Sequence, residues 1–442
     1  MTGDRMIAHL LAADAVARDA AEKWLGRHRP PLGDHSVHAV GERYLVGLAG
    51  VIVTAAALVF LKRDRHGPRM VGPRGGEIMG RFTLLLTGLA LWLVAFVTPS
   101  NAEDYTKPGP FAVGLQKFTF SDTSGKRSMA AMIWYPAAGP VPDPNAVLDD
   151  SIDAPAATSG PYPLVVVIHG LSGLGYMFGS VGRHLASHGF VVAAADYDTG
   201  PLDYGVSWED RQTVWLLYNR PANVVRVIGY ADMLGAPGGK LAGVIDTSRI
   251  GVWGLSTGGT TAFQAAGAQI DLKALDAWCA VNKEDAKADE TCQFVGHEQA
   301  IATHYGVSDP FAAPMPPIWD KRVAALVAAA PGGELHAFGD KGIAAVKLPT
   351  LIMFASDDTD VSPKFNALWA YDGIGSPDKA LATFDHGGHT FFMNSSTPNF
   401  REATALATAF FLAVLKGNPA DRASSMRDVA SFPGLSYRTT LH

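Results

Sequence analysis

The sequence predicts an α/β fold, in which a mostly parallel twisted sheet carries helices on both faces and one long segment is inserted. Short aliphatic runs alternate with helical patterns, as they do in parallel sheets covered by helices. The run Leu164–Ile168 is continuously aliphatic, which is typical of a central parallel strand. The alternation stops after residue 270 and resumes at Val323. The chain has 442 residues, of which 48% are hydrophobic, enough for one large domain with appendages.

Each expected element follows from its own pattern. Two β-like runs around an Asp-Thr-Ser-Gly turn predict an antiparallel hairpin, and the aliphatic runs that follow alternate with amphipathic stretches. Residues 270–320 interrupt this order, contain several prolines and predict a lid. The expected strands are Phe111–Phe120, Met129–Tyr135, Leu164–Ile168, Phe190–Ala195, Arg249–Trp253, Val323–Ala329, Pro349–Ala355 and Ala380–Phe384, and the expected helices are Phe178–His188, Pro221–Leu234, Gly259–Gly267 and Phe400–Leu415.

Two apolar segments precede the expected domain. Tyr44–Leu61 is long enough to span a bilayer. Phe82–Val97 follows Arg81 and ends in Ser100-Asn101-Ala102, a small-x-small pattern typical of a signal-peptide cleavage site. We therefore expect an N-terminal extension over 1–78, with Met79 as an alternative start, a signal peptide or membrane anchor over 79–102, and the folded domain over 103–442. Both readings place that domain outside the cytoplasm, either periplasmic or secreted, or tethered to the membrane.

Charge and cysteine content narrow the function. The net charge is −6 and no basic stripe is present, which argues against nucleic-acid binding. In an exported protein Cys279 and Cys292 predict a disulfide, the alternative being two buried free thiols. His184 and His188 lie four residues apart on an expected helix, but no third ligand accompanies them, so we expect surface or packing residues and neither a metal nor a cofactor.

The segment Gly254-Leu255-Ser256-Thr257-Gly258 matches the G-x-S-x-G nucleophile elbow. A buried strand is expected before it and an alanine-rich helix after it, which is the context that the motif requires. A sharp strand-to-helix turn exposes the serine hydroxyl, and only small neighbours permit such a turn. We therefore predict Ser256 as a nucleophile.

A serine hydroxyl needs a general base that is oriented by an acid. In this arrangement the acid and the histidine follow later strands, in the order Ser, acid, His. Three aspartates follow Pro349–Ala355. We choose Asp358, three residues past Ala355, and keep Asp360 and then Asp357 as alternatives.

The histidine is expected after the last strand of the sequence pattern. His389 follows two glycines and precedes two phenylalanines, so we predict it as the base, with His386 as the alternative. The oxyanion needs two backbone N–H donors. We expect these from Thr257 and from Leu171, where Gly170 permits the turn; His169 is expected to be structural.

A resemblance adds to this reading. Trp134-Tyr135-Pro136-Ala137, His169-Gly170-Leu171, the run His184–Val192, Arg220-Pro221-Ala222 and Gly254–Gly258 resemble the exported dienelactone-hydrolase-like and platelet-activating-factor-acetylhydrolase-like branch of the α/β-hydrolases. The likeness extends from about Gly109 to about Leu415. It implies an α/β-hydrolase fold, cofactor-free cleavage of carboxylic esters, and a lid at the cysteine-bearing insertion. True dienelactone hydrolases use a cysteine nucleophile, so dienelactone is not the expected substrate of a chain with Ser256.

The sequence therefore predicts an exported serine esterase that acts on a small-molecule or lipid ester through Ser256, His389 and Asp358. A lipase or a polyester (cutinase-like) hydrolase is the alternative; Trp208, Trp215 and Tyr218 could form an aromatic wall for it, although such residues more often belong to a core. The expected lid makes an open polymer-binding groove less favourable. A non-catalytic binding protein with this fold is the third reading.

Overall fold

The computed structural model describes residues 104–121, 128–145, 147–197, 213–282, 289–417, 426 and 431–441. The expected N-terminal extension, the apolar segment 44–61 and the segment 79–102 lie outside these residues. Within the described ranges, no helix is both long and apolar enough to cross a membrane.

The described strands form one ten-stranded sheet, with the order β10-β9-β8-β7-β6-β4-β5-β2-β1-β3. Strands β4 to β9 pair parallel with one another. At the two flanks, β10 pairs antiparallel with β9, β2 pairs antiparallel with β5 and with β1, and β3 pairs parallel with β1. The strands are β1 (Ala112–Ser121), β2 (Ser128–Ala137), β3 (Ser151–Ile152), β4 (Tyr162–Ile168), β5 (Val191–Ala195), β6 (Ile245–Leu255), β7 (Val323–Ala329), β8 (Thr350–Ala355), β9 (Lys379–Phe384) and β10 (Leu435–Thr439).

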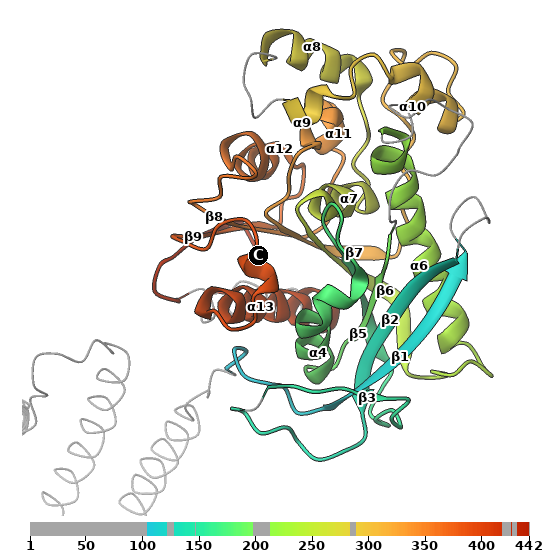
Figure 1. Ribbon diagram of the computed structural model, residues 1–442, viewed down its shortest axis with the longest axis vertical. Coiled ribbons are helices and arrows are strands. Elements are labelled where there is room, and N and C mark those ends of the chain that lie inside the picture. The colour runs from blue at the N-terminus through green and yellow to red at the C-terminus, as the bar shows by residue number, and fades with distance from the viewer. Residues whose placement is uncertain are drawn as a thin grey trace, which may run out of the picture. The chain divides into compact units, whose positions relative to one another are not determined.

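Helices lie on both faces of this sheet (Figure 1). They are α4 (Gly179–Ser187), α6 (Arg220–Gly235), α7 (Thr257–Ala265), α8 (Leu272–Asn282), α9 (Asp289–Cys292), α10 (Glu298–His304), α11 (Gly339–Ile343), α12 (Trp369–Gly373) and α13 (Pro398–Phe411), with short helical turns η1 (Gly175–Phe178), η2 (Trp215–Asn219), η3 (Leu335–Phe338), η4 (Lys364–Leu368), η5 (Phe391–Met393) and η6 (Leu412–Lys416).

The two faces of β4 show how the aliphatic run produces these layers. Side chains alternate across a strand, so Val165 and Val167 pack with the residues of α4 and α13. Val166 and Ile168 pack on the other face with the residues of α6 and α7. All seven residues of β4 are buried, as a central strand covered on both faces requires. The predicted α/β-hydrolase fold class, with a mostly parallel sheet, is confirmed.

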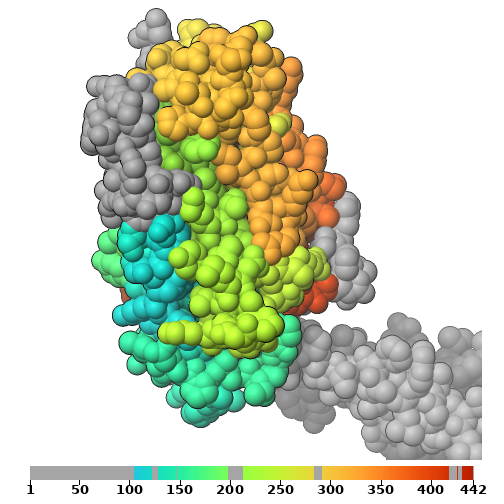
Figure 2. Space-filling view, turned by 90° about the vertical axis from the view of Figure 1, so that its right-hand side faces the viewer, coloured from blue at the N-terminus to red at the C-terminus, as the bar shows by residue number. Residues whose placement is uncertain are grey.

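The segment between α7 and β7 carries α8, α9 and α10, which lie together at one end of the molecule in Figure 1. Its two ends meet where the Met315 N–H donates to the Ile270 carbonyl at 2.7 Å. Leu275, Phe294 and Ile301 are fully buried and belong to the same apolar cluster as α6 and α7. In Figure 2 the yellow and light-orange atoms of this part of the chain form one continuous mass at one end of the face. The segment is therefore packed onto the core, and its role as a lid stays a prediction.

Parallel strands bring their carboxyl ends to one edge of a sheet. Because β6, β7, β8 and β9 are consecutive and parallel, the segments that follow them share that edge. Ser256 follows β6, Asp358 lies three residues beyond β8, and His389 lies five beyond β9. The topology thus places the three predicted residues at the same edge.

Candidate active site

Ser256 sits in a strained turn between β6 and α7. Its backbone has φ 58° and ψ −128°, a conformation that side-chain-bearing residues rarely adopt. The surroundings hold it there: the Ser256 N–H donates to the Ala329 carbonyl at 3.0 Å, and the Ser256 carbonyl accepts from the Gly259 N–H at 2.7 Å. This is the backbone geometry of a nucleophile elbow.

The two outer glycines of the motif are required by close backbone approach. A Cβ on Gly254 would overlap the carbonyl oxygen of Gly258. A Cβ on Gly258 would overlap the carbonyl oxygen of Ile168 on the neighbouring strand β4. Neither glycine has a positive φ, so space, and not backbone conformation, selects glycine at both positions.

Asp358 and His389 are in direct contact. The Asp358 Oδ2 lies 2.8 Å from the His389 Nδ1, and their side chains are 1% and 11% exposed. The other carboxylate oxygen, Oδ1, accepts the backbone N–H groups of Asp360 at 3.0 Å and Val361 at 2.9 Å. The carboxylate is thus held by its own loop and presents one oxygen to the imidazole, as an orienting acid does.

The alternative residues lie elsewhere in the same two loops. The Asp357 carboxylate accepts backbone N–H groups of Gly387 and Gly388 and lies 3.7 Å from the exposed His386 ring. The side chain of Asp360 is exposed. Among these candidates, the structure places only Asp358 against His389.

Thr257 directly follows Ser256 in the chain, and Gly170, the residue before Leu171, lies close to Ser256. Thr257 opens α7 and is buried. The Gly170 Cα approaches the nucleophile so closely that a Cβ there would lie 3.2 Å from the Ser256 Cβ and 3.8 Å from its Oγ. Over the described residues, no hydrogen bond is found for the backbone N–H of Leu171 or of Thr257.

Gly170 does not make the turn that the sequence predicts for it. Gly170 has no positive φ; the left-handed residue of this loop is Ser172, with φ 57°. The proximity of Ser256 and of the Leu255 carbonyl therefore favours glycine at position 170, and the left-handed residue of the turn comes two residues later.

His169 is structural, as expected. It is 1% exposed, and its Nε2 accepts the Tyr197 N–H at 2.9 Å while its Nδ1 lies 2.7 Å from the Gly170 carbonyl oxygen. This network assigns a neutral ring protonated at Nδ1. Burial and the nearby Arg220 lower its pKa to about 3, so the ring stays neutral and braces the loop.

Sequence reasoning missed Arg220 as a support of the site. Its buried guanidinium donates to the His169 carbonyl and, at 3.1 Å, to Thr261 Oγ1 on α7. It also lies over the rings of Tyr197 and Trp215. Arg220 therefore joins the loop that carries Leu171 to the helix that begins at Thr257. An arginine directly before the expected helix Pro221–Leu234 was the available signal.

The loop after β7 was also missed. The Gly332 N–H donates to the Ser256 carbonyl at 3.4 Å, and the buried Glu334 accepts the Thr257 hydroxyl at 3.2 Å. The Thr260 hydroxyl donates to the Gly332 carbonyl at 2.9 Å. The Gly-Gly-Glu sequence that begins three residues after the expected strand Val323–Ala329 was the signal.

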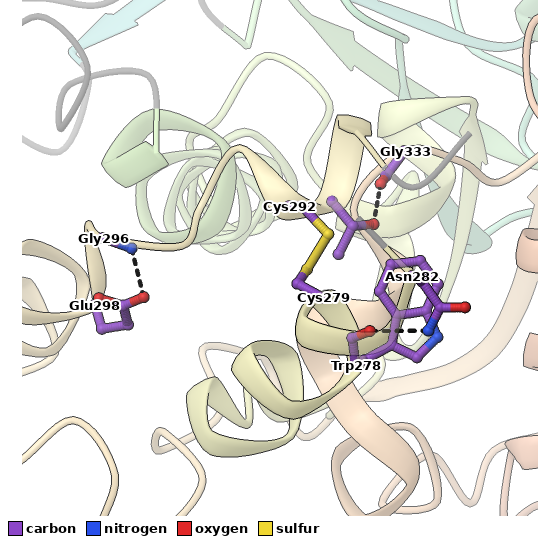
Figure 3. Close-up of a disulfide and its surroundings, with 8 residues drawn as sticks. Trp278, Cys279, Asn282, Cys292, Gly296, Glu298 and Gly333 are labelled. Atoms are coloured by element: carbon purple, nitrogen blue, oxygen red, sulfur yellow. Dashed lines mark hydrogen bonds between the residues drawn. A yellow bond between two sulfur atoms is a disulfide. The ribbon is translucent and has the colours of Figure 1, made fainter. Parts of the chain in front are cut away.

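A disulfide joins Cys279 on α8 to Cys292 on α9, which confirms the predicted pairing (Figure 3). Next to it, the buried Thr291 hydroxyl donates to the Gly333 carbonyl. The inserted segment is therefore tied to the loop that contacts Ser256 and Thr257.

His184, His188, Trp215 and Tyr218 pack against other side chains. The rings of His184 and the buried His188 pack at a tilt, with centroids 4.8 Å apart, and burial together with His188 lowers the pKa of His184 to about 3. Trp215 is buried in the core and Tyr218 packs edge-on against Tyr305; Trp208 lies outside the described residues. Within the part of the chain that is described, no group of three or more His, Cys, Asp or Glu side chains could hold a metal.

The fold and the elbow define the class of protein: the chain is an α/β-hydrolase-type protein. Residues 141–323 match the model of a family described as PETase, PET hydrolase-like. The match spans β4, the elbow and the inserted segment, and it supports the hydrolase superfamily that the sequence resembles. The match does not show that the chain belongs to the dienelactone-hydrolase-like branch. A search of curated proteins returned no match.

Proposed function

We propose that this protein is an exported serine hydrolase that cleaves carboxylic esters through an acyl-enzyme. The observation that carries the proposal is the Asp358–His389 hydrogen bond at the sheet edge where Ser256 occupies its strained turn. An oriented imidazole beside a serine elbow is the arrangement that acyl transfer requires. The match to a PET hydrolase-like family supports ester hydrolysis as the activity.

In this proposal each residue has one role. His389 takes the proton from Ser256 as the hydroxyl attacks the ester carbonyl, and Asp358 keeps the imidazole in the required tautomer. The N–H groups of Leu171 and Thr257 stabilise the oxyanion. His389 then returns the proton to the leaving alcohol, and water releases the acid from Ser256.

The test is hydrolysis of p-nitrophenyl esters, from acetyl to long-chain acyl, by the full-length protein and its variants. Ser256→Ala should abolish turnover and labelling by a fluorophosphonate probe. His389→Ala should lower kcat by several powers of ten, whereas His386→Ala should retain most activity. An active His389→Ala beside an inactive His386→Ala would reassign the base. A wild-type protein that neither turns over esters nor labels would favour the non-catalytic reading.

Polyester or lipid-ester hydrolysis at an interface is the second candidate. The family match favours it, as do three exposed apolar side chains that follow β4: Leu171 and Tyr176 are each 59% exposed and Met177 is 41% exposed. Exposed apolar side chains beside a site suit an apolar substrate surface. Release of soluble acids from a polyester film, or activation by emulsified triglyceride, would support this candidate; activity on soluble monomeric esters alone would oppose it.

Export is part of the proposal. The Cys279–Cys292 disulfide supports it, because disulfides persist in oxidising compartments. N-terminal sequencing of the protein from the periplasm or medium should begin after Ala102 for a cleaved signal peptide, while a start upstream of Tyr44 would support a membrane anchor.

A further inference from the structure

The loop that carries His389 contains two adjacent glycines in unusual conformations. Gly387 has φ 146° and Gly388 has φ 64°, values that side-chain-bearing residues rarely adopt. Glycine loses more conformational freedom on folding than other residues, so such a loop is intrinsically mobile. A general base must nevertheless be held within about 0.5 Å of its working position. Something must therefore fix the backbone directly before His389.

The carboxylate of Asp357 makes that connection. Its Oδ1 accepts the Gly388 N–H at 2.9 Å and its Oδ2 accepts the Gly387 N–H at 3.4 Å. The two oxygens thus engage the two consecutive amides that lead into His389. These hydrogen bonds also lower the pKa of Asp357, because they stabilise its ionised form.

The first half of the loop is anchored by other groups. The Ser356 hydroxyl donates to the Asp385 carbonyl at 2.5 Å, and the Asn399 side chain donates to the His386 carbonyl. These two hydrogen bonds hold Asp385 and His386 but do not reach the two glycines that follow. Over the described residues, the Gly387 and Gly388 amides donate to Asp357 alone.

We propose that Asp357 is a positioning residue for catalysis: its carboxylate clamps the Gly387 and Gly388 amides and thereby holds His389 on Asp358. Two adjacent aspartates divide the task, because Asp358 orients the imidazole ring and Asp357 fixes the backbone that carries it. The inference rests on the proposed function, since it assigns a role in that same site.

The experiment compares Asp357→Asn and Asp357→Ala with Asp385→Asn in the full-length protein. Asp385 is an exposed carboxylate of the same loop, and no hydrogen bond of its side chain is found among the described residues, so Asp385→Asn removes one charge and leaves the clamp intact. The readouts are kcat and KM on a p-nitrophenyl ester, together with the low-field proton resonance expected for a His389 Nδ1–H bonded to a carboxylate.

Asp357→Ala should lower kcat by about 10- to 100-fold with little change in KM, since small displacements of a catalytic group have effects of this size. The Nδ1–H resonance should broaden or vanish. Asp357→Asn should fall between Asp357→Ala and wild type, because an amide supplies one acceptor oxygen in place of two. Asp385→Asn should match wild type in all three readouts.

Equal kcat and an unchanged resonance in Asp357→Asn and Asp385→Asn would overturn the proposal, and that charge-matched pair decides alone if Asp357→Ala does not fold. A failure of the proposed function is recognised separately, by an active Ser256→Ala variant or by the absence of fluorophosphonate labelling in the wild type.

Discussion

Asp358 and His389 are 31 residues apart in the chain, yet the Asp358 carboxylate lies 2.8 Å from the His389 imidazole with almost no exposure to solvent. The contact exists because β8 and β9 are parallel neighbours, so the loops that follow them meet. Two backbone N–H groups fix the remaining carboxylate oxygen. The orientation of the imidazole is therefore determined by backbone hydrogen bonds on the acid's own loop.

Asp358→Asn should keep the His389 ring in place but change which of its nitrogens carries the proton. The asparagine oxygen would keep the Asp360 and Val361 amides and would turn its NH₂ group toward His389. His389 would then have to accept at Nδ1, which protonates Nε2 and prevents it from acting as a base. We expect kcat to fall by about 10³- to 10⁴-fold.

Asp360→Asn is the control for this prediction, because the Asp360 side chain is exposed and the hydrogen bond from Asp360 to Asp358 is donated by its backbone N–H. Its kcat should stay within about threefold of wild type, an effect typical of a surface change. Steady-state kinetics on one ester substrate measure both variants. A larger loss in Asp360→Asn than in Asp358→Asn would show that the acid is misassigned.

Some parts of the candidate site could be predicted from the sequence and others could not. The elbow is readable because Gly254, Ser256 and Gly258 are adjacent in sequence and local sterics dictate the pattern. The acid is harder to predict, because three aspartates share one loop. Which of them faces His389 depends on where that loop turns. The division of roles between Asp357 and Asp358 depends on the path of the His389 loop, which no local pattern encodes.

The fold shows the same limit. The buried parallel strands are readable because a strand covered on both faces is continuously aliphatic. The edge strand β10 was not predicted, since Leu435–Thr439 is largely exposed and pairs only through β9. Likewise, the hydrogen bond from Thr291 to Gly333 joins residues 42 apart, and only the packed insertion brings them together.

Gly254→Ala should destabilise the protein and abolish activity. The added methyl group would overlap the Gly258 carbonyl, which is rigid backbone, so the elbow would have to move. Overpacking of this kind typically costs about 1–3 kcal/mol. Gly229→Ala on α6 is the matched control, because an added Cβ there meets nothing within 4 Å; it should stabilise by roughly 0.5–1 kcal/mol.

Thermal and urea unfolding of the two glycine variants measure this difference. A Gly254→Ala protein with the wild-type midpoint and turnover would contradict the close approach of Gly254 to Gly258.

Loss of the disulfide should lower stability. The Cys279–Cys292 bond closes a loop with a sequence separation of 13, and cross-links of this length contribute about 2–4 kcal/mol. The double variant Cys279→Ser/Cys292→Ser should therefore unfold at a lower urea concentration than the oxidised wild type. Dithiothreitol should shift the wild type toward the variant and leave the variant unchanged; a wild type that does not respond to complete reduction would contradict the prediction.

Acid should destabilise the fold through buried histidines. Burial lowers the pKa of His169 and His184 to about 3 and that of His336 to about 4. Unfolded histidine has a pKa near 6.5, so between these values the unfolded chain binds more protons than the folded one. Stability is then complete above about pH 6.5 and falls as the pH drops toward 4, by up to about 1.4 kcal/mol per pH unit for each histidine.

Asp276 acts in the opposite direction. Burial and the neighbouring Glu298 raise its pKa to about 6, so from about pH 6 down to pH 4 the folded state binds this proton more tightly. Burial also raises the pKa of Glu402, and these two carboxyls together offset only part of the contribution of the three histidines. The net slope of stability against pH should therefore remain positive in this range.

His336→Phe tests the assignment of this slope to particular residues. His336 stacks on Trp278 with ring centroids 3.9 Å apart and packs against Trp369 at 4.3 Å, so a phenyl ring suits the same space. In urea titrations between pH 4 and 8, the unfolding free energy of the variant should depend less steeply on pH than that of the wild type, by at most the contribution of one proton. Its stability near pH 8 should stay within about 1 kcal/mol of wild type. His386→Gln, at a histidine that is 88% exposed, should leave the slope unchanged. If both variants kept the wild-type slope, the acid sensitivity would have to come from groups other than His336.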